Sequence, residues 1–236
     1  MLQNSHLGNK SVLIAVSNHT QLGSTGNSTG YWLTDVSHTY YALKRAGYSV
    51  EFVSPKGSQA NADRNSMDMS DDENLAFTSG LGPMGALDCT TRASRIEDPS
   101  RFAAILFAGG HGSMWDFPLC RGLQRLAREI YESGGVVAAV GKGTSALVNL
   151  KLSDGSYLVA GKHFTSTSDA EELAMRMTKI VPFSLEQKLT ERGGIYEKAF
   201  QGVGQPHVVN CLRLLTGQNA ASARALGEAL AAELDK

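Results

Sequence analysis

The residues best placed to do chemistry lie in a sharp turn that follows a buried strand. The wholly apolar, β-branched run 136–140 is typical of a strand covered on both faces, and it stops at Gly141, Lys142 and Gly143 before the helix-like stretch 144–147. A strand that turns this tightly presents its turn at the rim of the sheet, where side chains and free backbone N–H groups face a substrate. The turn offers an amine and backbone donors, with neither Ser nor Cys at its apex.

Three roles are open to the Lys142 amine. Burial near the start of a helix favours the neutral amine, which can act as a base or as an imine-forming nucleophile. A neighbouring carboxylate, such as Asp35 or Glu172, would instead keep the side chain charged as an electrostatic clamp. The third role is that of an ordinary surface lysine pointing into solvent.

A second glycine-rich turn, 109–112, follows the strand-like run 102–107. Because glycine has no Cβ, the N–H groups of Gly110 and Lys142 can both approach a carbonyl or carboxylate oxygen. Glycines that only permit tight turns explain the same spacing equally well. His111 in this turn either lines a pocket or is a hydrogen-bonded structural histidine.

Alternating strands and helices predict an α/β fold with a doubly wound, mostly parallel sheet, in which ligands bind outside the carboxyl ends of the strands. We expect one domain over 1–236, with 55–99 as a cap or lid insertion inside it. The expected strands are 12–16, 50–53, 102–107 and 136–140; the expected helices are 31–45, 119–133, 169–178 with Ser168 as N-cap, and one from Ser222; a hairpin is expected over 157–165 around Gly161.

Composition narrows the possible partners. The 236 residues carry a net charge of −1 and a pI near 6.6 without Lys/Arg clusters, so neither nucleic acid nor a membrane surface is an expected partner. The polar start, Met1 to Asn9, and the absence of a run of roughly 18 to 20 apolar residues favour a cytoplasmic protein. The widely spaced cysteines predict free thiols and neither a disulfide framework nor a zinc site, and no metal or cofactor is expected; they are Cys89, Cys120 and Cys211.

A phosphate-binding loop is excluded at the elbow. That motif needs Gly five residues before its final Gly and Ser or Thr directly after the Lys, and Val136 and Gly143 occupy those two places.

Four strings carry a resemblance to a known family. They are FAGGHGSMWDFP at 107–118, GGVVAAV at 134–140, QPHVV at 205–209 and LTGQN at 215–219. From about Lys10 to Leu234 the chain resembles the ThiJ/PfpI superfamily, and within it the branch of heat-shock chaperones and glutathione-independent glyoxalases, the DJ-one relatives. This resemblance implies a flavodoxin-like sheet in the class I glutamine amidotransferase style and a homodimer.

The resemblance also implies roles for single residues. The family's elbow cysteine falls on Gly141 and its histidine on Lys142, so both are missing here. The acid that contacts the cysteine falls on Asp35, the acid that completes the triad falls on Glu172, and the Gly110 and Lys142 amides match the oxyanion donors. We therefore expect catalytic roles for Asp35, Lys142 and Glu172, and substrate-binding roles for Gly110, His111 and Gly141.

Because glyoxalase and deglycase chemistry in this family runs through a thiolate adduct, glycine at position 141 removes that mechanism. We therefore expect first an enzyme of hydratase, dehydratase or isomerase type. It would act on a small carbonyl or unsaturated metabolite, with Asp35 and Lys142 moving protons without a cysteine. The alternative is a noncatalytic small-molecule binder or chaperone-like dimer, and residual glyoxalase or deglycase activity is a third reading.

Overall fold

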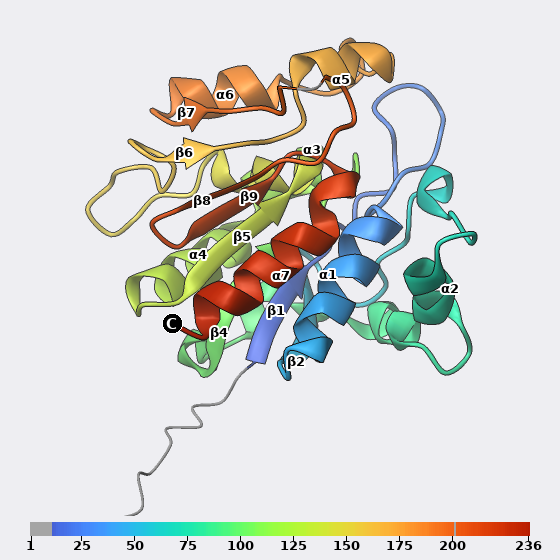
Figure 1. Cartoon of the computed structure of the whole chain (residues 1–236), viewed down its shortest axis with the longest axis horizontal. Coiled ribbons are helices and arrows are strands. Elements are labelled where there is room, and N and C mark those ends of the chain that lie inside the picture. Colours follow the sequence, from blue (N-terminus) through green and yellow to red (C-terminus); the bar gives the residue numbers. More distant parts are fainter. Residues whose placement is uncertain (1–10, 201) are drawn as a thin grey trace, which may run out of the picture.

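A seven-stranded sheet forms the centre of the part of the chain that the computed structural model describes, residues 11–200 and 202–236. Its strand order is β3-β2-β1-β4-β5-β9-β8, and every described neighbouring pair except β8 and β9 is parallel. Helices cover both faces of the sheet (Figure 1). The predicted fold class, a flavodoxin-like, doubly wound, mostly parallel sheet, is confirmed. The expectation drawn from Met1 to Asn9 lies outside the described residues.

The elements have the following bounds. The strands of the large sheet are β1 Ser11–Ala15, β2 Ser49–Ser54, β3 Thr91–Arg92, β4 Phe102–Phe107, β5 Val136–Val140, β8 Val208–Cys211 and β9 Leu214–Gly217, and a small sheet pairs β6 His163–Phe164 with β7 Ile195–Tyr196. The α-helices are α1 Leu33–Arg45, α2 Asp72–Thr78, α3 Ser113–Asp116, α4 Arg121–Glu132, α5 Asp169–Ala174, α6 Leu185–Glu191 and α7 Ala223–Leu234. Short 3-10 helices are Arg64–Ser66, Pro83–Cys89, Ala93–Arg95, Pro99–Arg101, Phe117–Leu119, Gly141–Leu147 and Ala220–Ser222.

The apolar strand runs are explained by two hydrophobic cores, one on each face of the sheet. Because side chains alternate along a strand, Leu13 and Ile105 enter the core that contains α4, whereas Ile14 and Leu106 enter the core that contains α1 and α7. Every residue of β1 and of β5 is buried. None of the helices in the described part of the chain is both long and apolar enough to cross a membrane.

Two predicted helices begin later than expected because the preceding residues are held in other structure. The N–H of Tyr31 donates to Asn61 O at 3.0 Å and that of Trp32 donates to Gly109 O at 2.8 Å, so α1 begins at Leu33. The second helix, α4, begins at Arg121, two residues after Leu119, because 117–119 forms a 3-10 turn that contains Pro118.

The hairpin predicted over 157–165 is wrong. Tyr157 forms an isolated antiparallel bridge with Lys151, and residues 158–161 form turns. β6 pairs in parallel with β7, more than 30 residues further along the chain: His163 with Ile195 and Phe164 with Tyr196. A short apolar run does not specify its partner, and here the partner follows α6, a helix that the sequence pattern did not indicate.

The upper end of the sheet is where a ligand site is expected. The carboxyl ends of β1, β4 and β5 meet at this edge, and the small sheet with α5 and α6 lies over it (Figure 1). The segment 55–99 contains α2 and three of the 3-10 helices, and α2 packs beside α1 at the side of the molecule (Figure 1). Its role as a lid remains a prediction.

Candidate functional site

The turn after β5 is a tight elbow, as predicted, and Gly141 forms its apex. Gly141 has φ of +53°, a left-handed conformation that strains a residue with a Cβ. Residues 141–147 form a buried 3-10 helix rather than the expected α-helical start. A Cβ placed on Gly141 would lie 3.6 Å from Asp35 Oδ2 and 3.7 Å from Thr167 Oγ1, which is ordinary contact distance. A small side chain would therefore fit at the apex, beside a carboxylate and a hydroxyl.

Asp35 lies beneath this apex. It projects from the first turn of α1, and its side chain is buried, with 2% relative exposure. Oδ2 accepts a hydrogen bond from the Gly109 N–H at 3.0 Å, while buried Oδ1 has no hydrogen-bond partner among the described residues. Burial raises the pKa of Asp35 to about 7, against the smaller lowering effects of the Gly109 amide and Lys142. Near neutral pH this carboxyl group can therefore both accept and donate a proton.

The raised pKa of Asp35 predicts a pH-dependent stability. A folded-state pKa of about 7, above the ordinary 3.8, means that protonation favours folding; this contribution is complete below the ordinary value and is lost as the pH rises through 7. Asp35→Asn keeps an acceptor for Gly109 and removes the titration. From pH 5 to pH 8 the wild type should lose on the order of 2 to 3 kcal/mol of unfolding free energy relative to this variant.

Urea denaturation of both proteins at pH 5, 6.5 and 8 measures this difference. Burial also raises the pKa of Asp116, to about 6, but this group is common to both proteins and cancels in the comparison. Parallel stability curves for the wild type and the variant would contradict a raised Asp35 pKa.

Lys142 and Glu172 form a buried ion pair. Lys142 Nζ lies 2.9 Å from Glu172 Oε1, and the side chains are only 6% and 5% exposed. The surface-lysine role is therefore wrong, because the Lys142 amine points inward and contacts Glu172 of α5. The pairing agrees with the charged clamp among the roles left open. The other Glu172 oxygen, Oε2, is buried without a hydrogen-bond partner among the described residues.

The two glycine-rich turns meet as expected. Gly110 has φ of +115°, and a Cβ there would lie 2.3 Å from Gly30 O, so only glycine fits. The Ser113 hydroxyl lies 2.8 Å from the carbonyl oxygens of both Gly110 and Lys142 and holds the turns together. Hydrogen bonds between described residues use no N–H of Gly110, which leaves this donor available to a ligand.

A cavity of about 230 Å³ opens over the apex. Four of the six predicted site residues line it, namely Gly110, His111, Gly141 and Lys142. Asp35 and Glu172 do not line it: Asp35 lies below the apex and Glu172 lies behind Lys142. The lining residues that the sequence did not indicate are Trp32, Thr167, Glu171, Met175, Val203, Gly204, Asn219 and Ala220.

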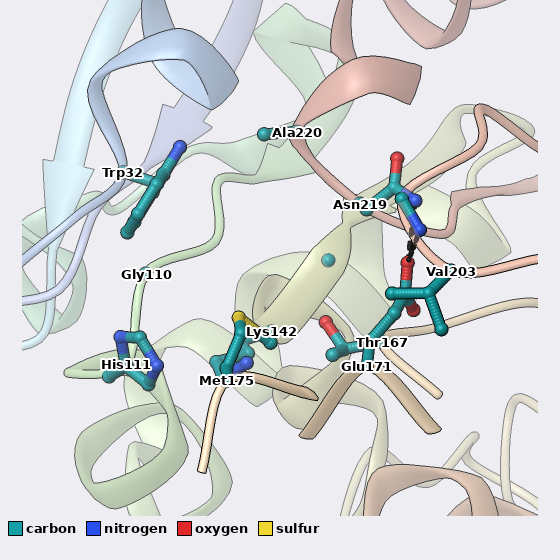
Figure 2. A pocket seen from close by; sticks show the side chains of 12 residues that line it. Trp32, Gly110, His111, Lys142, Thr167, Glu171, Met175, Val203, Asn219 and Ala220 are labelled. Carbon is teal, nitrogen blue, oxygen red and sulfur yellow. Dashed lines mark hydrogen bonds between the residues drawn. The ribbon is translucent and has the colours of Figure 1, made fainter. Parts of the chain in front are cut away.

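Figure 2 shows Trp32, Gly110 and His111 along one side of the cavity, facing Thr167, Glu171 and Asn219. Asn219 Nδ2 donates to Glu171 Oε1 at 2.7 Å. Glu171 also accepts bonds in the capping box with Ser168, so the predicted N-cap of α5 is confirmed. The capping box can be predicted from the sequence because its residues lie within one helical turn. The other residues of this side of the cavity come from segments that are far apart in the sequence.

The three cysteine thiols lie outside the lining of the cavity. Cys89 is exposed, Cys120 and Cys211 are partly exposed, and none of them lines the cavity. Among the described residues no group of three or more His, Cys, Asp or Glu side chains is arranged to hold a metal ion. The groups that lie at the elbow are the buried Asp35 carboxyl group and the N–H groups of the two turns.

The protein is of the flavodoxin-like α/β class: its sheet is doubly wound and mostly parallel, and the elbow after β5 lines a cavity. Within that class, the DJ-1/PfpI family model matches residues 28–233, and the chain belongs to the DJ-1/PfpI family.

Named relatives extend over nearly the whole chain. A glutathione-independent glyoxalase of Schizosaccharomyces pombe is 29% identical, covering 96% of this chain and 98% of its own. The structure of the 24 kDa Rapid Encystment Protein of Francisella tularensis aligns with a TM-score of 0.90 and 32% identity over 95% of this chain and 99% of that one. Glyoxalase III of Candida albicans aligns with a TM-score of 0.85 and 25% identity over 95% and 97%.

These relatives correct the expected reaction. The hydratase, dehydratase or isomerase expected from the sequence is wrong, because full-length relatives are named as glyoxalases. The expected reaction rests on taking a glycine at the elbow apex to exclude glyoxalase activity.

Proposed function

We propose that this protein is a glyoxalase-type enzyme that converts a small 2-oxoaldehyde into the corresponding 2-hydroxy acid without a protein thiol. Support comes from full-length relatives named as glyoxalases and from a cavity of about 230 Å³, which suits a small molecule. Trp32 and Met175 give this cavity apolar walls for the alkyl or aryl end of such a substrate.

One observation carries the proposal: no side chain at Gly141 separates the Asp35 carboxyl group from a substrate at the apex. The position that a Cβ would take at Gly141 is 3.6 Å from Asp35 Oδ2. In a chain with a side chain at the apex, that side chain stands beside the carboxyl group. Here no side chain does, so a substrate carbon that packs against Gly141 can approach Asp35 closely enough to react.

The hydrate of the substrate replaces the thiol adduct. Small 2-oxoaldehydes add water at the aldehyde carbon, and the hydrate R–CO–CH(OH)₂ contains the same atoms as the product R–CH(OH)–COOH. Ionised Asp35 removes the proton from C1, which is acidic because C2 is a carbonyl, and the electron pair moves to the C2 oxygen. Asp35 then returns the proton to C2, and one C1 hydroxyl passes its proton to the negative C2 oxygen as the carboxylic acid forms.

The surrounding residues stabilise the charge that develops in this step. The Gly110 N–H donates to the C2 oxygen as it becomes negative, which is the role of an oxyanion hole. The N–H of Lys142 is the second proposed donor. The ammonium of Lys142, held by Glu172 at 2.9 Å, is a fixed positive charge that also lowers the pKa of Asp35 and so favours its basic form.

Turnover of methylglyoxal, followed by NMR detection of lactate, tests this function. The decisive protein is a variant with Cys89, Cys120 and Cys211 all replaced by Ser. We expect it to form product within about twofold of the wild-type rate, because none of these thiols lines the cavity. The wild type should also resist N-ethylmaleimide.

Two results would contradict the proposal in different ways. No product above the uncatalysed rate with the wild type, across methylglyoxal, phenylglyoxal and glyoxal, would exclude glyoxalase activity. Product that disappears in the cysteine-free variant, while its melting temperature is unchanged, would show that a thiol takes part.

A further inference from the structure

The ring of His111 lies in the wall of the cavity without a hydrogen-bond partner. The residue is 6% exposed, and neither Nδ1 nor Nε2 is within hydrogen-bonding distance of a partner among the described residues. Burying an imidazole in this way is unfavourable unless another molecule completes its hydrogen bonds. Figure 2 shows the ring beside Gly110, on the side of the cavity shared with Trp32.

A carboxylate lies behind this ring. Asp63 Oδ2 is 3.7 Å from His111 Nδ1, and it also accepts a hydrogen bond from Thr29 Oγ1 at 2.8 Å. The Asn65 N–H binds the other oxygen of Asp63 at 2.9 Å. Burial works against ionisation of Asp63, yet His111 together with the Thr29 and Asn65 donors lowers the pKa of its carboxyl group. An ionised Asp63 favours the tautomer with the proton on Nδ1, which leaves Nε2 as an acceptor.

The kind of ligand depends on where His111 Nε2 lies relative to the Gly110 N–H. The Gly110 N–H and the His111 ring come from consecutive residues of one turn, and both residues line the cavity. Oxygens on adjacent carbons of a small molecule have the matching arrangement when one is a carbonyl and the other carries a hydroxyl proton.

We infer that His111 is the specificity-determining residue of this cavity: its Nε2 accepts a hydrogen bond from a hydroxyl group on the carbon next to the carbonyl that Gly110 binds. Asp63 and Thr29 are positioning residues that act through the ring. In the substrate class of the proposed function, on which this inference rests, the hydroxyl belongs to the hydrated aldehyde carbon. The ligand class is thus an α-hydroxy carbonyl or its hydrated equivalent, and simple ketones and aldehydes bind more weakly.

Binding of two stable probes of nearly equal size tests the inference without any turnover. Hydroxyacetone carries the adjacent hydroxyl, and 2-butanone replaces it with a methyl group. Ligand-observed NMR titration of the wild type should give a Kd for hydroxyacetone at least about tenfold lower than that for 2-butanone. His111→Phe keeps a ring of similar size and should bring the ratio of the two Kd values close to one.

Conservative variants separate recognition from folding. His111→Gln offers a side-chain carbonyl as acceptor and should restore part of the discrimination. Asp63→Asn should reduce the ratio and raise KM for methylglyoxal more than it lowers kcat, since it loosens the ring without touching the reacting atoms. Melting temperatures identify any variant that is simply unfolded, in which case the His111→Gln ratio decides.

The outcomes distinguish this inference from the proposed function. Discrimination that persists unchanged in a folded His111→Phe protein overturns the role of His111, as does a wild type that binds both probes equally. Discrimination that depends on His111 in a protein without methylglyoxal turnover would support the role of His111 and reject only the glyoxalase reaction.

Discussion

Replacing Asp35 by Asn is expected to lower kcat for methylglyoxal by about 10² to 10⁴-fold at pH 7, the usual contribution of a positioned acid–base group. The variant retains an acceptor for the Gly109 N–H but has no group that can remove the C1 proton. In the wild type, kcat/KM should rise with pH through about 7 and then level off, because the ionised form of Asp35 is the base.

The control for this experiment is a second variant, Gly141→Ala. Its Cβ meets no atom closer than 3.6 Å, so it fits, at the cost of strain from a positive φ. The methyl group lies beside Asp35, where the substrate would pack against the apex, so activity should fall while Asp35 is unchanged. Activity of Asp35→Asn within threefold of the wild type would remove Asp35 from the reaction.

Asp35 also places stability and activity in opposition. Its protonated form favours folding at low pH, whereas its ionised form is required for catalysis near neutral pH. Asp35→Asn is therefore expected to be more stable than the wild type at pH 8 and yet inactive. Unfolding could not explain such a loss of activity.

Breaking the ion pair between Lys142 and Glu172 is expected to have the largest effect on stability. Lys142→Met leaves a carboxylate buried with neither oxygen paired, which costs about 3 to 5 kcal/mol of unfolding free energy. Replacing both partners, Lys142→Met with Glu172→Gln, removes both charges and should recover most of that loss. Urea denaturation of the two single variants and the double variant gives the coupling energy.

A surface pair provides the matched control. Lys188 and Glu191 lie 2.8 Å apart, but their side chains are 36% and 59% exposed, so Lys188→Met should change stability by less than about 1 kcal/mol. Equal effects of Lys142→Met and Lys188→Met would show that Lys142 is solvated in solution.

Local sequence patterns predicted the central elements well. The runs 102–107 and 136–140 match β4 and β5 residue for residue, because an uninterrupted apolar segment that ends at a glycine-rich turn leaves few alternatives to a strand buried on both faces. Ser168 was recognised as an N-cap because capping depends on residues within one turn. The hairpin over 157–165 failed because strand pairing is decided by segments far apart in sequence.

The amino-acid sequence by itself determined the layered fold, the elbow, and the fact that its apex carries no side chain. Only the tertiary structure decided that the Lys142 amine is paired with Glu172, that Asp35 is dry enough to titrate near neutral pH, and that His111 lacks a partner. Residue types and their periodicity fix which segments are buried, because burial follows hydrophobicity along the chain. Protonation and pairing depend on the distances between side chains from different loops, and those distances exist only after the sheet has brought the loops together.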